Sequence, residues 1–485
     1  MKNLLYILIV ACILAPESVP GADESKRAAD SPVSAVDSII DIVLDRHIDP
    51  PTRQEMLLAG MRAAYRKAGK PLPRGLSRRI SEITTPDQID TFLAEQLTEI
   101  GGGKAVEASL VVGLLDCVRG GASLTDASVS RVSSQVAANR YVGTGIALGI
   151  DGASKQPVIS KVFYNGPAWK AGAKGKDLIL EIDGEATGTM QMNDVLTALR
   201  GDAKSVVRML VRQPDTDEKR ELVVTRDRVF LPSVEGHRLV SEGQWKYTID
   251  DTPEIAVIRL TGVGPSTLHE LRQVENTLRE QDVRGIVLDL RSGAALLHDV
   301  VMVADALIDD AVIGHIQSLD GRKTHVARAG AMFSGMPMVV LTSRLTAAGQ
   351  VFLTSALQDS GRAVVVGERT PGNTYVRSLI DVPGRDEQIT LATAVMHRAD
   401  GTPLLVQNRP SSRGPLLNAE QAAVLRKKRT GFIMPDHEVP GGQSIPRRLQ
   451  KDYAVLSTAI AAIKEKLNDK TSETPVSVET TPASE

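Results

Sequence analysis

The hydrophobic pattern of the first part of the chain is helical. Between residues 34 and 101, apolar residues recur every three or four positions in SAVDSIIDIVLDRHI and TRQEMLLAGMRAAYRKAG, as on the buried face of an amphipathic helix. The sequence Asp49-Pro50-Pro51 separates the two stretches, and prolines favour a turn there. We therefore expect a helical N-terminal region over residues 23–140.

The pattern becomes strand-like between Tyr141 and Arg228. Short β-branched runs, broken by Gly and Asp, follow one another in TGIALGI, QPVISKVF, DLILEIDG, SVVRMLVR and RELVVTR, with one helical stretch in MQMNDVLTALRG. Runs of this length bounded by turn residues are typical of strands. The sequence predicts a compact β-rich domain over residues 141–229.

From Glu254 onward, strand-like and helical segments alternate. The strands EIAVIRL, GIVLDLR, MPMVVLTS and RAVVVGE are interspersed with the helical stretches STLHELRQVENTLREQ and LLHDVVMVADALID. Alternation of this kind favours an α/β domain with largely parallel strands, which we place at residues 230–440. Residues 441–485 should hold a helix and a disordered tail, because TSETPVSVETTPASE contains few apolar residues. The fold class is thus multidomain α+β.

The N-terminus has the pattern of an export signal. MKNLLYILIVACILAPESVPGADES contains one Lys, an apolar run and then small residues, so we assign residues 1–22 to a signal peptide with cleavage after Gly21 or Ala22. Lipidation at Cys12 is an alternative that would anchor the chain to a membrane. Either reading predicts a protein of the periplasm or cell envelope, and signal removal would leave Cys117 as the last cysteine and exclude an internal disulfide.

Composition argues against several other classes. The 57 Lys and Arg nearly balance 59 Asp and Glu, and no basic stripe is interleaved with aromatic residues, so nucleic acid is not an expected partner. The eight His show no metal-ligand spacing, and no Gly-rich phosphate loop opens a helix after a strand. We expect neither a metal nor a cofactor.

A Gly-rich turn marks a candidate peptide-binding loop. Gly143, Thr144, Gly145 and Ile146 lie just before a predicted strand, where converging backbone N–H groups can hold a carboxylate. The alternative is that these glycines only form a turn. The succession NGPAWKAGAKGKDLILEIDG and then MQMNDVLTALRG resembles a PDZ domain. The resemblance implies that protein or peptide C-termini bind beside this loop, with a groove helix near residues 190–200.

A PDZ domain between a helical region and an α/β domain resembles the carboxy-terminal processing peptidases, also called tail-specific proteases. GIVLDLR with the following helix, MPMVVLTS, SALQDSGRAVVVGERTPGN, ITLATAVMHRADGTPL and GFIMPDHEVP are similar to successive family segments. The resemblance covers roughly residues 40 to 440. It implies a crotonase-like α/β peptidase core and serine-type proteolysis by a Ser/Lys dyad, in which a neutral lysine activates the serine.

The dyad that the resemblance implies is missing. The serine position falls on Ala348, the lysine position on Asn373, and a supporting glutamine position on Arg377. An alanine cannot attack, and an amide cannot act as a base near neutral pH. The turn that would help form the oxyanion hole reads Gly293, Ala294 and Ala295, one residue shorter than in the family and with alanines in place of glycines.

Three functions fit this pattern. The leading hypothesis is an exported, proteolytically inactive family member that binds C-terminal tails. The second is an active serine-type peptidase with a relocated nucleophile, for which the nearby hydroxyls are Thr342, Ser343, Thr346 and Ser355. Its base would have to be His325 or His397, because no Lys occurs between Lys323 and Lys427. The third is an interaction scaffold whose N-terminal helices form a homo-oligomer.

Overall fold

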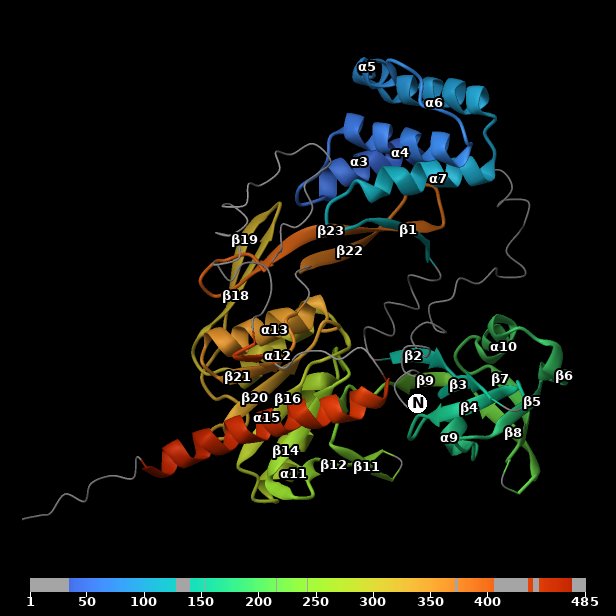
Figure 1. Cartoon of the computed structure of the whole chain (residues 1–485). Helices are drawn as coiled ribbons and strands as arrows, with labels where there is room; N and C mark the ends of the chain where they lie inside the picture. The colour runs from blue at the N-terminus through green and yellow to red at the C-terminus, as the bar shows by residue number, and fades with distance from the viewer. Residues whose placement is uncertain are drawn as a thin grey trace, which may run out of the picture.

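The computed structural model describes residues 35–127, 140–370 except 153, 215 and 242, 374–404, 435–438 and 445–472. Figure 1 shows a helical region at the top, an α/β core at the lower left and a β-rich domain at the lower right. The assigned signal peptide lies outside the described residues. Of the predicted disordered tail, Thr471 and Ser472 are described and end helix α15 (Ile445–Ser472), and the rest lies outside. None of the described helices is both long and apolar enough to span a membrane.

The N-terminal region packs its helices around one core. They are α3 (Val36–Arg46), α4 (Arg53–Lys67), α5 (Leu76–Ser81), α6 (Pro86–Ile100) and α7 (Lys104–Asp116). Helices α4 and α7 approach closely at glycines, since a Cβ on Gly113 would lie 2.4 Å from the Cβ of Ala63. The region predicted to be helical also contains a strand, β1 (Ser123–Asp126), which pairs with β23 (Glu387–His397) of the core.

The β-rich domain is a six-stranded sheet covered by short helices. The strand order is β3 (Ile146–Ile150), β4 (Pro157–Val162), β5 (Leu178–Ile182), β7 (Val206–Arg212) and β8 (Lys219–Thr225), with β6 (Glu185–Ala186) paired to β5. Helices α9 (Pro167–Lys170) and α10 (Met192–Leu199) lie at this sheet, and β2 (Arg140–Gly143) pairs with β9 (Asp227–Phe230) at the ends of the domain. The predicted groove helix corresponds to α10.

A mostly parallel sheet forms the centre of the α/β core. Its strands run in the order β10 (Val234–Glu235), β14 (Thr252–Leu260), β16 (Gly285–Asp289), β20 (Met338–Thr342), β21 (Ala363–Gly367) and β24 (His437–Glu438), with β13 (Thr248–Ile249) paired to β14. Pairing is parallel from β14 through β24. The continuous apolar runs of the sequence arise because both faces of these strands are covered.

Helices cover the two faces of this sheet. One cluster of buried residues joins Ile286 and Leu288 to α11 (Thr267–Arg279), α12 (Leu297–Leu307) and α13 (Ala348–Asp359). The opposite cluster joins Val287 and Val339 to Ile463 of α15 (Ile445–Ser472), which crosses the front of the sheet in Figure 1. The multidomain α+β class, with its β-rich domain and α/β core, is confirmed.

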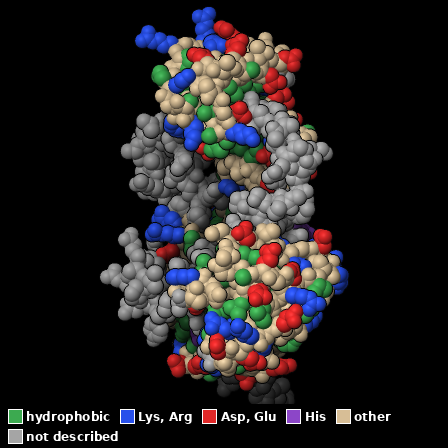
Figure 2. Space-filling view, turned by 90° about the vertical axis from the view of Figure 1, so that its right-hand side faces the viewer, with side chains coloured by type: hydrophobic (Ala, Val, Ile, Leu, Met, Phe, Trp, Pro, Cys, Tyr) green, Lys and Arg blue, Asp and Glu red, His purple; other side chains and the backbone are tan. Residues whose placement is uncertain are grey.

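A second, antiparallel sheet connects the core to the helical region. It contains β1, β23, β18 (Val312–Ser318) and β19 (Gly321–Val326), with β22 (Tyr375–Asp381) paired to β23. Small two-stranded pairs are formed by β11 (Arg238–Ser241) with β12 (Gln244–Lys246) and by β15 (Gly262–Val263) with β17 (Ala294–Ala295). On the described part of the face in Figure 2, basic and acidic side chains are interspersed.

Candidate functional site

The turn that leads to the predicted serine position, called here the nucleophile turn, connects β20 to α13. Strand β20 is buried along its length, and α13 begins at Ala348. The turn is closed by Thr346, whose Oγ1 accepts from the Ser343 amide at 2.9 Å and donates to the Leu290 carbonyl at 2.9 Å. The first residue of a helix is where a nucleophile would benefit from the positive end of the helix dipole. Here that position holds only the methyl group of Ala348.

The predicted oxyanion turn lies against the start of α13. A Cβ on Gly349 would lie 2.7 Å from the Cβ of Ala295, so the two positions that the resemblance associates are neighbours. Gly293 has a φ of 132°, and a Cβ there would lie 2.4 Å from the Thr261 carbonyl oxygen. Ala294 and Ala295 follow it as the short strand β17, paired with β15. Glycine is therefore required at 293 by both conformation and space.

Gln350 fixes this turn from inside the core. Its side chain is fully buried, and its Nε2 donates to the carbonyls of Leu260 and Ser292 at 3.1 Å each. The amide thus joins the end of β14 to the turn that precedes β17. The sequence pattern did not identify Gln350, although this polar residue directly precedes the apolar run 351–353 at the start of α13.

Of the two remaining dyad-related positions, Arg377 is the one that lies among the described residues. Asn373 lies outside the described residues. Arg377 lies on β22, and its Nη2 donates to the Gly120 carbonyl at the end of the helical region. The guanidinium therefore connects the antiparallel sheet to the loop after α7, and no contact in the described structure joins it to Ala348.

The candidate replacement hydroxyls all donate hydrogen bonds to backbone carbonyls. Thr342 Oγ1 donates to Glu368 O at 2.8 Å, and Ser343 Oγ donates to Arg291 O at 2.6 Å. Ser355 Oγ donates to Phe352 O at 2.7 Å within α13, where the side chain is fully buried. With Thr346 bound to Leu290, none of these hydroxyls has a base as its hydrogen-bond acceptor, which an activated nucleophile requires.

The candidate bases lie on the antiparallel sheet. His325 is on β19 and His397 on β23, and burial lowers the pKa of both imidazoles. His325 Nε2 and His397 Nδ1 have no hydrogen-bond partner in the described structure. The structure does not bring either ring into contact with Ser343 or Ser355.

A buried carboxylate anchors the carboxyl end of β16. Asp289 is 3% exposed and accepts from Arg291 Nη2 at 2.8 Å and from Arg259 Nε at 3.0 Å. Burial alone would raise the pKa of Asp289, but Arg291 and then Arg259 outweigh burial and lower it to about 2. Because the Arg291 carbonyl also accepts from Ser343, this ion pair network positions the nucleophile turn.

Hydrogen bonds to its carbonyl groups hold the Gly-rich loop of the β-rich domain in place. Thr144 O accepts from the Ala168 amide at 2.7 Å, and Gly145 O accepts from the Phe163 amide at 2.9 Å. Gly145 has a φ of 82°, which favours glycine. The Tyr141 ring packs on Gly143, and burial raises the pKa of its hydroxyl.

The predicted peptide groove would lie beside this loop. Strand β3 pairs with β4 and with no other strand among the described residues. Ile146 on β3 and Met192 and Leu196 on α10 are partly buried side chains that pack on one apolar cluster. A free strand edge next to partly exposed apolar side chains is the arrangement that accepts an extended peptide.

In the described part of the chain, no three His, Cys, Asp or Glu side chains are grouped so that they could hold a metal ion. Cys117 is a free thiol in that part of the chain, and burial raises its pKa to about 11. A thiol with a raised pKa is a poor nucleophile near neutral pH.

Comparison with known proteins places these parts in a family. Residues 254–408 match the sequence profile of peptidase family S41, and residues 158–213 match that of a PDZ domain. A carboxyl-terminal-processing protease of Picosynechococcus sp. is 32% identical over 228 residues, which cover 47% of this chain and 53% of the relative. A chloroplastic C-terminal processing peptidase of Tetradesmus obliquus is 31% identical over 267 residues, which cover 53% and 56%.

The chain thus spans about half the length of the curated relatives it matches. The solved photosystem II D1 C-terminal processing protease is 22% identical, with a TM-score of 0.39 and coverage of 85% of this chain and 94% of that chain. Residues 254–408 therefore form a peptidase family S41 core, residues 158–213 lie in a PDZ domain, and the chain is a homologue of the carboxyl-terminal-processing proteases.

Proposed function

We propose that this chain is an exported member of the family that binds protein C-terminal tails through its PDZ domain without cleaving them. The observation that carries the proposal is the alanine at position 348, at the start of α13, where the family resemblance implies the catalytic serine. Export rests on the signal-like pattern of residues 1–22.

Tail binding is supported by the geometry of the PDZ domain. The edge of β3 offers unpaired backbone groups to an incoming strand, and Met192 and Leu196 offer apolar contacts. The carbonyls of Thr144 and Gly145 already accept hydrogen bonds from the amides of Ala168 and Phe163. A ligand that matches these features ends in an apolar residue with a free carboxylate.

Loss of cleavage is supported by three features of the core. Ala348 offers no nucleophile, the nearby hydroxyls donate to carbonyls, and the turn at Gly293, Ala294 and Ala295 is one residue shorter than the family resemblance implies. A missing oxyanion donor alone costs about 3 kcal/mol of transition-state stabilisation in a serine protease. Several such losses together leave binding as the function that the chain supports best.

Fluorescence anisotropy with a short labelled peptide tests the binding part. A peptide with an apolar C-terminal residue should bind as the free acid and bind more weakly as the terminal amide. Leu196→Asp places a carboxylate in the groove and should weaken binding about tenfold or more, because tenfold corresponds to only about 1.4 kcal/mol. Val223→Asp on the exposed face of β8 is the matched control. Equal affinity for both peptides, or equal effects of both variants, would contradict the proposal.

The relocated-nucleophile alternative has a separate test. A serine-directed fluorophosphonate followed by peptide mass spectrometry should give no adduct on Ser343 or Ser355, because both hydroxyls are bound to carbonyls. A stoichiometric adduct on either residue, together with peptide cleavage, would establish an active peptidase instead.

Pairing of two copies through the N-terminal helices also stays a proposal. Val112 on α7 is 58% exposed and offers an apolar contact point. If these helices pair, Val112→Asp should convert a dimer to a monomer in sedimentation velocity. An unchanged sedimentation coefficient would remove this face of α7 from the proposal.

A further inference from the structure

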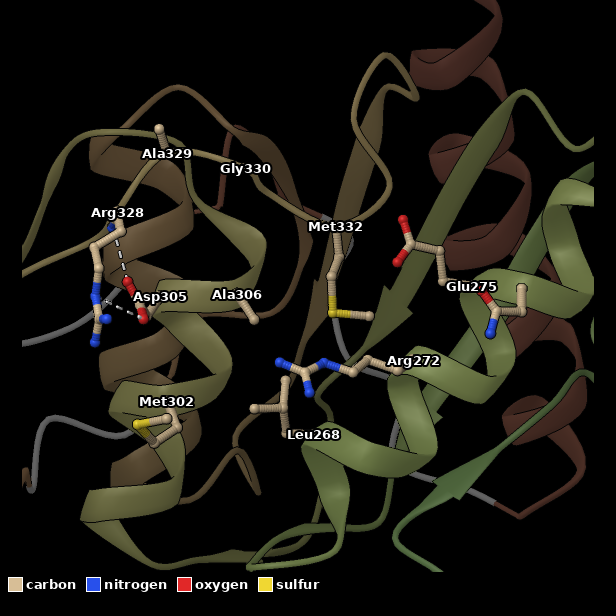
Figure 3. A pocket seen from close by; sticks show the side chains of 11 residues that line it. Leu268, Arg272, Glu275, Met302, Asp305, Ala306, Arg328, Ala329, Gly330 and Met332 are labelled. Atoms are coloured by element: carbon tan, nitrogen blue, oxygen red, sulfur yellow. Dashed lines mark hydrogen bonds and ion pairs between the residues drawn. The ribbon is translucent and has the colours of Figure 1, made fainter.

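A cavity of about 580 Å³ lies on the outer side of the α/β core, between α11, α12 and the segment after β19 (Figure 3). Its apolar lining includes Leu268 from α11, Met302 from α12 and Met332 from the segment. Small-molecule sites commonly enclose about 300 to 1,000 Å³. Methionine side chains adapt to apolar ligands of irregular shape.

The third wall of the cavity is held in place by hydrogen bonds. The Met332 amide donates to the Ala306 carbonyl on α12 at 2.7 Å, and the Phe333 amide donates to Glu275 Oε1 on α11 at 2.8 Å. Beneath this segment, Arg362 donates to the carbonyls of Phe333 and Met336 at 3.0 Å each. The cavity is therefore formed before any ligand enters it.

Among the described residues that line the cavity, the charged side chain without a hydrogen-bond or ion-pair partner is that of an arginine. In the described structure Arg272 makes no hydrogen bond or ion pair, and its guanidinium extends between Leu268 and Met332 in Figure 3. The lining carboxylates are already engaged. Glu275 accepts from Arg279 Nη2 at 2.7 Å, and Asp305 accepts from the Arg328 amide at 2.8 Å.

We propose that this cavity binds a small monocarboxylate with an apolar tail. The carboxylate would pair with Arg272, whose planar fork matches two carboxylate oxygens, and the tail would lie on Leu268, Met302 and Met332. A cationic ligand would be repelled by this guanidinium, and a neutral hydrocarbon would gain no charge pairing from it. This site is separate from the PDZ groove and does not depend on tail binding.

Methyl NMR of the full chain with labelled methionine tests the proposal, with decanoate as the probe. Decanoate should shift the methyl signals of Met302 and Met332 saturably, and it should bind about tenfold or more tightly than decanol. Arg272→Met should abolish that preference while keeping a long apolar side chain. Arg78→Met, which removes an exposed arginine on α5, is the matched control and should bind decanoate as the natural chain does.

Several outcomes would overturn the proposal. These are the absence of saturable shifts at Met302 and Met332, equal affinity for decanoate and decanol, or unchanged decanoate binding by Arg272→Met. Shifts produced by an acidic peptide but not by decanoate would replace the small ligand with a protein partner. Because Arg272 is exposed, its variant should keep the thermal transition of the natural chain. The peptide anisotropy assay stays independent of all these results.

Discussion

Replacing Asp289 with asparagine should destabilise the α/β core by about 2 kcal/mol at neutral pH. The side chain is buried, and its two arginine partners lower its pKa from 3.8 to about 2. Each pKa unit corresponds to about 1.36 kcal/mol of preference for the charged form in the folded state. Asparagine keeps the shape of the side chain but carries no charge for Arg291 and Arg259.

The pH dependence gives this prediction its sign. The folded-state pKa is below the unfolded value, so the stabilisation is complete above about pH 5 and is lost as the pH falls toward the folded value near 2. The difference in unfolding free energy between the natural chain and Asp289→Asn should fall to about half at pH 3. Asp320→Asn, in the exposed turn between β18 and β19, should show little difference at any pH.

Urea denaturation followed by circular dichroism measures these free energies. Hydrogen exchange of peptides from β16 and β20 identifies the transition that belongs to the core, since the chain contains several separately packed units. A difference that stays constant across the pH range would refute the electrostatic account of Asp289. A difference below about 0.5 kcal/mol at neutral pH, the usual size of an unremarkable surface substitution, would refute its structural importance.

Three further predictions concern packing, the binding loop and the antiparallel sheet. Phe352→Ala should lower the unfolding free energy of the core by about 3–5 kcal/mol, because this ring is fully buried, and an unchanged thermal transition would contradict it. Gly145→Ala should weaken peptide binding in anisotropy. A φ of 82° costs alanine about 1–2 kcal/mol, and the added Cβ would lie 3.1 Å from Pro167 Cδ. Binding with the affinity of the natural chain would contradict this prediction. Burial lowers the pKa of His325 and His397 from 6.5, so protonation of these side chains should lower the unfolding free energy of the chain as the pH falls below that value. If a double His→Gln variant shows the same dependence of unfolding free energy on pH in urea denaturation as the natural chain, this prediction is wrong.

The sequence predicted the elements whose signals are local. Strand β20, the small-residue turn and α13 could be predicted because an apolar run, a turn and a helical period follow one another within a short segment. Gly361, a residue type that often ends a helix, follows α13 with a φ of 69°. Continuous apolar runs also predicted the parallel sheet, since such strands are buried on both faces.

The sequence could not predict contacts between distant segments. Arg377 was expected to occupy the position of a supporting glutamine, yet its contact is with Gly120, 257 residues away in the sequence. The pairing of β1 with β23 was missed for the same reason, because no local turn joins these two strands. The roles of Gln350 and Asp289 depend on which carbonyls and arginines the fold brings near them, and a polar residue in an apolar run does not name its partner.

The central claim is that this chain holds C-terminal tails without cutting them, and mass spectrometry of a bound peptide tests it most directly. The purified full chain is incubated with a free-acid peptide at a concentration that saturates binding in anisotropy. The mass and the amount of the retained peptide are then measured, and the same experiment is carried out with Leu196→Asp. The account predicts intact peptide with the natural chain and clearly less retained peptide with the variant. Cleavage products that appear with the natural chain, persist through repeated purification and vanish with Leu196→Asp would contradict it.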